Sequence, residues 1–446
     1  MIDQSLFEKY DTSSPRYTSY PPINLWEDNI DEKEWLEQIN RSYNINKGID
    51  LYIHIPFCEK LCYYCGCNRI ITKNHNVEET YILALLNEWN IYLKKFPDLT
   101  IKNIHFGGGT PTFLSPFSFN KILNIFSKNF DPEDFTGSVE IDPRTLKDDH
   151  IKNFNKYGLK KASLGIQDFD KNVQKTINRE QPFQLVEDVV NRLRSNGFDS
   201  VNFDLIYGLP RQTRESILST IDSVELLSPD TISLFSYAHI PEMLLNQKIL
   251  DKDPRLEGFD KYNLFESAKT KLINSGYKFF GIDHFSKESD ELYRYFDNKD
   301  VKRTFMGYVK NRSDIIIGLG SSAISYSGLG YIQNNKVVSE YISDVEGSKI
   351  SIIRGHTQSF LDTQVNLLIQ NLMCYGVVDI FPTLIDYPKN EARDIILNLA
   401  TPIRDGLISI NNGSLKVLSK GEPFLKQLCS YFDYRLNSQT QQSLPS

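Results

Sequence analysis

The chain has 446 residues, of which 40% are hydrophobic, so it is long enough for two or three domains with buried cores. Its formal net charge of -7 argues against a nucleic-acid-binding protein. Residues 1–15 lack a basic start followed by an apolar run, and no apolar stretch reaches the roughly 20 residues that span a bilayer. We therefore expect a cytoplasmic protein that binds neither nucleic acid nor membrane.

The first expected unit covers residues 1–48. It begins as an arm rich in proline and hydroxyl side chains at Ser14–Pro22, and a helical pattern follows at Glu32–Ser42.

From residue 49 to about 350, strand patterns alternate with helical patterns. The strand-like runs are Leu51–Ile55, Ile101–Phe106, Ser138–Ile141, Ala162–Ile166, Val201–Ile206 and Thr231–Phe235. The helical patterns between them are Val77–Lys95, Phe117–Phe130, Leu185–Asn196 and Arg214–Leu227. This alternation is typical of α/β proteins with a parallel sheet, and six units predict a partial (β/α)6 barrel that is open on one side. A helix at Gly258–Ser275 and strands at Lys278–Phe285 and Ile315–Ile317 extend it.

A small, mainly helical unit is expected over residues 355–436. Helical patterns at Phe360–Met373 and Asn390–Ala400 precede an alternating run, Gly406–Leu418, that contains the Asn-Gly turn typical of hairpins. A last helix is expected over Glu422–Arg435. Helices around a hairpin predict a winged-helix-like domain, and the Ser/Gln-rich tail at 437–446 is expected to be disordered.

Four of the six cysteines, Cys58, Cys62, Cys65 and Cys67, lie within ten residues, directly after the first barrel strand. In parallel barrels, that end of the strands carries the active site. Three thiolates can hold three irons of a four-iron cluster and leave the fourth iron open to a small molecule. The alternative is a structural zinc site formed by all four thiols, but zinc sites favour cysteine pairs spread over a longer loop.

Polar and glycine residues follow the other strands. Gly107–Thr110, after the second strand, can expose backbone groups to a ligand. Glu140 and Asp142 lie on the same side of the third strand, whereas Gln167 and Asp204 interrupt apolar runs on the fourth and fifth. Each could instead be a helix cap or a satisfied core hydrogen bond. Together they predict a ring of polar groups around the barrel mouth.

The Cys58-x3-Cys62-x2-Cys65 spacing after a strand resembles the signature of the radical S-adenosylmethionine superfamily. That resemblance implies one 4Fe-4S cluster held by these three cysteines. It also implies reductive cleavage of S-adenosylmethionine to methionine and a 5′-deoxyadenosyl radical.

Several other stretches resemble the oxygen-independent coproporphyrinogen III oxidase family within that superfamily. They are Pro15-Arg16-Tyr17-Thr18-Ser19-Tyr20-Pro21, Cys65-Gly66-Cys67-Asn68, Gly165-Ile166-Gln167-Asp168-Phe169, Asn178-Arg179-Glu180-Gln181, Asp204-Leu205-Ile206-Tyr207-Gly208-Leu209-Pro210 and Gly281-Ile282-Asp283-His284-Phe285. Two related branches, a haem chaperone and a haem-opening radical methyltransferase, are the alternative interpretations. They usually lack the residue equivalent to Cys67 and the N-terminal arm.

The oxidase resemblance implies two S-adenosylmethionine molecules in one active site. It assigns Tyr52, Gly108 and Glu140 to the first molecule. It assigns a larger set to the second molecule: Tyr64, Gly109, Thr110, Gln167, Arg179, Asp204, Ala238 and Ile324.

The implied reaction converts two propionates of coproporphyrinogen III to vinyl groups, giving protoporphyrinogen IX. The implied partners are this substrate and an electron donor such as flavodoxin or ferredoxin, and we expect a monomer. A substrate with four carboxylates calls for cations, for which Arg16, Lys302 and Arg303 are candidates. Around Leu361–Asp362 the family pattern has basic residues that are missing here.

Overall fold

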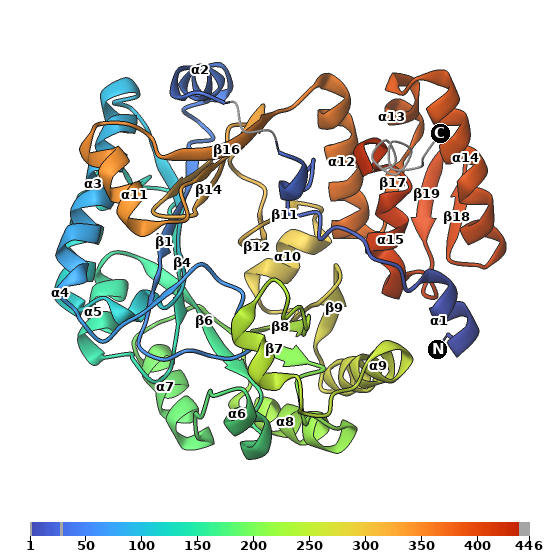
Figure 1. Cartoon of the computed structure of the whole chain (residues 1–446), viewed down its shortest axis with the longest axis horizontal. Coiled ribbons are helices and arrows are strands. Elements are labelled where there is room, and N and C mark those ends of the chain that lie inside the picture. The colour runs from blue at the N-terminus through green and yellow to red at the C-terminus, as the bar shows by residue number, and fades with distance from the viewer. Residues whose placement is uncertain (1, 27–29, 437–446) are drawn as a thin grey trace.

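A twelve-stranded open sheet forms the centre of the computed structural model, which describes residues 2–26 and 30–436 (Figure 1). The expected disordered tail lies outside these residues. Six consecutive neighbours in the sheet are parallel: β1 (Ile49–Ile55), β4 (Ile101–Gly108), β5 (Thr136–Ile141), β6 (Leu159–Gln167), β7 (Ser200–Tyr207) and β8 (Thr231–Ser236). The predicted α/β partial barrel is therefore confirmed.

Helices cover the outer face of this sheet, as the alternation predicted. They are α3 (Val77–Lys95), α4 (Pro116–Phe126), α5 (Asp148–Lys156), α7 (Phe183–Ser195), α8 (Arg214–Leu227) and α9 (Gly258–Asn274). The short helix α6 (Lys171–Thr176) instead packs in a separate small core with Leu209 and Tyr237. Every residue of β1 is buried, which is typical of a strand with both faces covered. Helices α3 and α8 match their predicted bounds.

Further strands widen the sheet at both edges. On one side, β13 (Ile316–Leu319) pairs parallel with β1 and is followed by antiparallel β14 (Ile324–Tyr326), β15 (Gly330–Asn334) and β16 (Ile352–Thr357), with α11 (Val338–Glu346) between the last two. On the other side, β10 (His284–Ser286) pairs with β8 and β9 (Lys278–Phe280). The prediction of one strand over Lys278–Phe285 is therefore wrong. Gly281, at φ 63°, turns the chain between two short antiparallel strands.

The N-terminal residues divide between two hydrophobic cores. Helix α2 (Glu32–Ser42) buries Trp35 and Ile39 in the barrel core. Helix α1 (Gln4–Tyr10) instead packs Phe7 against the C-terminal region. The domain bounds at 48 and 350 stay predictions.

The C-terminal region surrounds a three-stranded sheet. Its elements are α12 (Phe360–Tyr375), β17 (Val377–Asp379), α13 (Phe381–Asp386), α14 (Lys389–Arg404), β18 (Ile408–Asn411), β19 (Ser414–Val417) and α15 (Leu425–Ser430). The hairpin at Asn412-Gly413 is confirmed. The last helix is shorter than predicted at both ends, because a 3-10 turn at Glu422–Phe424 precedes α15 and α15 ends at Ser430. Asp362, where the resemblance would place a basic residue, is buried and binds Arg435 through two hydrogen bonds of 2.6 and 2.8 Å.

The arm runs from α1, beside the C-terminal helices, toward β11 (Val301–Thr304) and α12 (Figure 1). The hydroxyls of Tyr17 and Tyr20 both donate to Asp433, at 3.1 Å each. Both rings are buried, so the arm contributes to the C-terminal core. Helix α10 (Glu291–Asp297) and strand β12 (Gly307–Lys310) lie beside β11. No helix within residues 2–26 and 30–436 is long and apolar enough to cross a membrane.

Candidate functional site

A cavity of about 390 Å³ opens at the carboxyl ends of the parallel strands, where active sites of such barrels lie. We call it the cysteine-loop pocket. Eleven of the fourteen predicted site residues line it: Cys58, Cys62, Cys65, Tyr64, Gly108, Gly109, Thr110, Glu140, Gln167, Arg179 and Asp204. Residues from five strands and three loops therefore converge on one cavity, as the predicted polar ring requires.

The cysteine loop starts and ends in a short parallel ladder between β2 (Phe57–Cys58) and β3 (Ile70–Ile71). Side-chain amides hold its backbone from outside. Asn246 Nδ2 donates to the carbonyls of Tyr63 (2.8 Å) and Cys65 (3.1 Å). Gln247 Nε2 donates to the carbonyl of Tyr64 (3.1 Å). These bonds fix the loop conformation before any ligand binds.

The cysteine thiols have polar neighbours that suit sulfur ligands. Cys58 Sγ lies 3.2 Å from Thr110 Oγ1, and Arg179 Nη1 lies 3.6 Å from Cys62 Sγ. The backbone N–H of Cys67 donates to Cys65 Sγ at 3.4 Å, which favours the thiolate of Cys65. The side-chain hydrogen bond from Cys67 lowers the pKa of Cys65, and Arg69 lowers it further.

No three His, Cys, Asp or Glu side chains among the described residues are grouped around a single metal-ion position. In a four-iron cluster each thiolate bonds a different iron atom. Such a site needs its thiols around one cavity rather than around one ion. Cys58, Cys62 and Cys65 meet that requirement, so the three predicted ligands fit the cluster; Cys67 lines the same cavity.

The glycine run after β4 packs directly on its neighbours. A Cβ atom at Gly107 would lie 2.8 Å from Glu140 Oε1, and one at Gly108 would lie 2.7 Å from the His54 ring. Gly108 also has φ 112°, which side chains rarely adopt. Its N–H donates to Glu140 Oε2 at 3.2 Å. The run therefore has to be glycine, and its backbone fixes the carboxylate of Glu140.

A buried carboxylate between two arginines forms the electrostatic centre of the pocket. Asp142 Oδ2 accepts from Arg144 Nη2 at 2.6 Å and from Arg179 Nη1 at 3.2 Å. Burial opposes ionisation of Asp142, but the charges of both arginines outweigh burial and hold its pKa below the usual range. Arg179 also donates to the carbonyl of Gly165 at 2.9 and 2.6 Å. This arginine is therefore held rigidly beside the cysteines.

Asp204 and Gln167 complete the polar ring. Asp204 accepts from Ser163 at 2.9 Å and from Asn202 at 2.8 Å. Burial raises the pKa of Asp204, and the charge of Glu140 raises it further. Gln167, the last residue of β6, has φ 67°. Non-glycine residues with such backbone strain are concentrated at functional sites.

Three predicted residues do not line the pocket. Tyr52 is buried beneath it, where its hydroxyl lies 3.0 Å from His54 Nδ1. Ala238 is exposed after β8, and Ile324 begins β14. Sequence reasoning left Arg144 out of the site, although its place two residues after Asp142 at the end of a strand was a usable signal.

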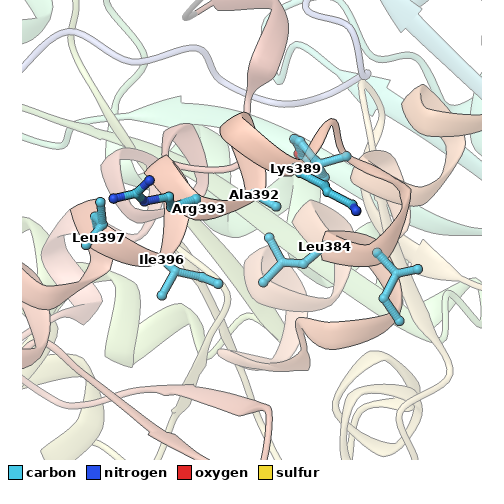
Figure 2. A pocket seen from close by; sticks show the side chains of 8 residues that line it. Leu384, Lys389, Ala392, Arg393, Ile396 and Leu397 are labelled. Carbon is cyan, nitrogen blue, oxygen red and sulfur yellow. The ribbon is translucent and has the colours of Figure 1, made fainter.

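A second hollow lies between α13 and α14 (Figure 2). Its lining is mostly apolar, with Lys389 and Arg393 as its charged residues. It contains none of the predicted site residues. The cysteine-loop pocket is therefore the candidate site.

Comparison with known proteins agrees with this geometry. A family model described as the radical SAM superfamily matches residues 52–224. The oxygen-independent coproporphyrinogen III oxidases of Salmonella typhimurium and Escherichia coli are each 35% identical to this chain, over 97% of it and 95% of their own length. The solved structure of coproporphyrinogen III oxidase from Escherichia coli, described as a radical SAM enzyme, superposes with a TM-score of 0.90 at 32% identity. It covers 98% of this chain and 99% of its own.

The partial barrel and its three-cysteine loop define a radical S-adenosylmethionine enzyme. Because the similarity to these relatives extends over nearly the whole chain, this protein belongs to the oxygen-independent coproporphyrinogen III oxidase family. The predicted family and fold are thus confirmed.

Proposed function

We propose that this protein converts two propionate side chains of coproporphyrinogen III to vinyl groups, giving protoporphyrinogen IX without oxygen. Each conversion removes a hydrogen atom from the β-carbon, carbon dioxide and one electron. The observation that carries the proposal is that the three cysteines share one cavity with the glycine run and the polar ring, in a chain similar to these oxidases along its length.

Cys58, Cys62 and Cys65 would hold the 4Fe-4S cluster, and Glu140 with the Gly108 backbone would hold the first S-adenosylmethionine. When bound, these groups supply the hydrogen-atom abstraction chemistry. The protein fixes the Glu140 carboxylate through the Gly108 N–H and His105 Nε2, at 3.2 and 3.3 Å. Tyr52 supports the position of His105 next to Glu140, since the Tyr52 ring stacks on the His105 ring.

We also propose a second S-adenosylmethionine, bound by Tyr64, Gly109, Thr110, Gln167, Arg179, Asp204, Ala238 and Ile324. Arg179 already pairs with Asp142 and lies beside Cys62, so its removal would disturb the cluster as well. Asp204 is the cleaner test, because its partners Ser163 and Asn202 do not contact the cysteines. Equilibrium binding should give two sites in wild type and one in Asp204→Asn. A single site in wild type would overturn the two-molecule proposal.

The electron donor would be a flavodoxin or ferredoxin, and the working form a monomer. The cytoplasmic location stays a prediction from the sequence. Analytical ultracentrifugation of the reconstituted enzyme tests the monomer directly.

The decisive test is anaerobic incubation of reconstituted enzyme with coproporphyrinogen III, S-adenosylmethionine and a reductant, followed by mass analysis. Two successive losses are expected, each of one carbon dioxide and two hydrogens. Stoichiometric haem binding without turnover would support a chaperone instead. Zinc in place of iron and sulfide would support a structural metal site.

A further inference from the structure

Three cations from distant parts of the chain meet where the arm passes between the barrel edge and the C-terminal region. Arg303, on β11, donates from Nη1 to the carbonyls of Arg16 (2.7 Å) and Tyr17 (2.9 Å). On the other side of the arm, Gln427 of α15 donates to the carbonyl of Thr12 at 3.0 Å. These contacts bring the three segments together, and the charges of Arg16 and Arg303 both act on Lys426. We call Arg16, Arg303 and Lys426 the cation group.

The cation group has more positive charge than its surroundings neutralise. Within the described part of the chain, neither Arg16 nor Lys426 has a carboxylate within 4.0 Å of its charged nitrogens. Burial lowers the pKa of Lys426, and the charge of Arg16 lowers it further. Two carboxylates, Asp283 and Asp11, act on Lys426 from farther away, and Asp283 is itself bound to His284 Nδ1 at 2.6 Å. Such a group favours an added anion, because like charges held together in a partly buried site repel one another.

Lys302, the third cation suggested by the sequence, is not available to a ligand. Its Nζ lies 3.3 Å from the buried carboxylate of Asp50 and also donates to the carbonyl of Ser313. Its neighbour Arg303 points to the arm instead, as the bonds to Arg16 and Tyr17 show.

A line of polar side chains connects this region with the cysteine-loop pocket. Strand register pairs Asp204 with Ser233 and Ser233 with His284, so the three residues lie side by side on neighbouring strands. Ser233 Oγ and His284 Nε2 are 3.4 Å apart. Asp204 lines the pocket, and Asp283 beside His284 interacts electrostatically with Arg303 and Arg16. The cation group therefore lies at the far end of the polar inner face that starts at the pocket.

We infer that the cation group binds a carboxylate of the tetrapyrrole substrate and anchors the macrocycle while another propionate reacts in the cysteine-loop pocket. This inference rests on the proposed function, since it takes coproporphyrinogen III as the ligand. A planar guanidinium matches a carboxylate with two parallel hydrogen bonds, and a lysine adds a mobile point charge. The arm then supplies Arg16 to the substrate site in addition to its packing.

The test compares Arg16→Gln and Lys426→Gln with wild type as reconstituted, anaerobic enzymes. The probe is coproporphyrin III, the stable oxidised tetracarboxylate, and its affinity is measured by fluorescence titration. Each variant should raise Kd roughly tenfold or more, the range for a lost hydrogen bond to a charged group. KM for coproporphyrinogen III should rise similarly, whereas cluster content and the spectral response to S-adenosylmethionine should stay unchanged. Lys426→Arg should restore most of the affinity.

Two controls separate charge recognition from folding. Lys420→Gln removes an exposed lysine of the same region and should bind like wild type. The tetramethyl ester of coproporphyrin III lacks the carboxylates and should bind equally to wild type and both Gln variants. If Lys426→Gln fails to fold, the exposed side chain of Arg16 still carries the test. Wild-type Kd in both Gln variants would overturn this inference and leave the proposed function intact. A wild-type enzyme that neither binds coproporphyrin III nor converts coproporphyrinogen III would overturn the proposed function itself.

Discussion

The cysteine-loop pocket and the cation group differ in how their charges are neutralised. In the pocket, Arg179 and Arg144 share the carboxylate of Asp142, and the loop backbone is tied down by Asn246 and Gln247. At the cation group, no carboxylate among residues 2–26 and 30–436 forms an ion pair with Arg16 or Lys426. The first region is rigid and electrostatically balanced without a ligand, as preorganised catalytic sites are. The second gains its balance only when an anion binds, which suits a substrate that enters and leaves.

The largest expected effect lies in the balanced region. Cys58→Ala, Cys62→Ala or Cys65→Ala should each abolish the cluster, because three thiolates are the minimum for this site. Cys67→Ala should still assemble one: Cys67 also lines the pocket, but the family resemblance assigns only the other three thiolates to the cluster, and Cys67 contributes a hydrogen bond to Cys65. Iron and sulfide analysis after anaerobic reconstitution measures the difference. Equal iron loss in the Cys67 variant would refute the three-cysteine assignment.

Deleting residues 9–22 should affect the cation group and leave the cysteine-loop pocket intact. The pocket receives no side chain from this arm, so the cluster should assemble normally. Turnover should fall by about 100-fold, the range for loss of substrate positioning. Tyr17→Phe with Tyr20→Phe is the matched control: it keeps both buried rings and removes only the bonds to Asp433. Anaerobic turnover assays measure the effect, and full activity in the deletion would show that the arm serves packing alone.

The rigidity of the cysteine loop depends on Gln247, which is 1% exposed and bonds Tyr64, Ala238 and Ile240. Gln247→Ala should destabilise the bound conformation of the loop by roughly 1–3 kcal/mol and speed iron loss to a chelator several-fold. Gln247→Glu keeps the shape of the side chain but replaces both donated hydrogen bonds with repulsion between oxygens. This variant should therefore lose iron at least as fast as Gln247→Ala.

The control for this experiment is Gln184→Ala, which removes an exposed glutamine of α7 far from the loop in sequence. Iron release followed by visible absorption should be indistinguishable between this variant and wild type. Equal rates in Gln247→Glu and wild type would mean that the amide bonds do not hold the loop.

The barrel and most of the pocket could be predicted because their signals are local. Strand-like runs alternating with helical patterns marked the six parallel strands, and the cysteine spacing lay directly after the first. The sheet edges could not be predicted, because β14 to β16 are short strands whose pairing depends on β13 lying beside β1. The hairpin at Gly281 was predicted as one strand, because the positive φ of Gly281 depends on packing and is not visible in the apolar pattern.

The charge pairs could not be predicted from the sequence either, because their members lie far apart along the chain. The partners Asp142 and Arg179 are 37 residues apart, and Arg303 contacts an arm residue 287 positions away. Sequence position suggested Arg16, Lys302 and Arg303 as equal candidates for substrate carboxylates. The fold distinguishes them, because Asp50 neutralises Lys302.

The smallest expected effect is a pH dependence at Lys261, which lies next to the cation group. Burial and then the charge of Lys426 lower its pKa from 10.5 to about 8, against the opposing charges of Glu257 and Asp11. Lys261 therefore loses its proton as pH rises through 8 in the free enzyme. If it contributes to the field that attracts substrate carboxylates, Kd for coproporphyrin III should rise a few-fold across that range. Fluorescence titrations below and above pH 8 measure this.

Protein stability should change in the opposite direction over a higher range. Between pH 8 and 10.5 the unfolded chain holds the Lys261 proton and the folded chain does not, so this residue's contribution to stability rises with pH. Lys261→Met should remove both dependences, whereas Lys269→Met, which breaks a partly exposed ion pair with Glu422, should retain them. A Kd that rises through pH 8 equally in wild type and Lys261→Met would assign the titration to another group and confine the attraction of the substrate to Arg16, Arg303 and Lys426.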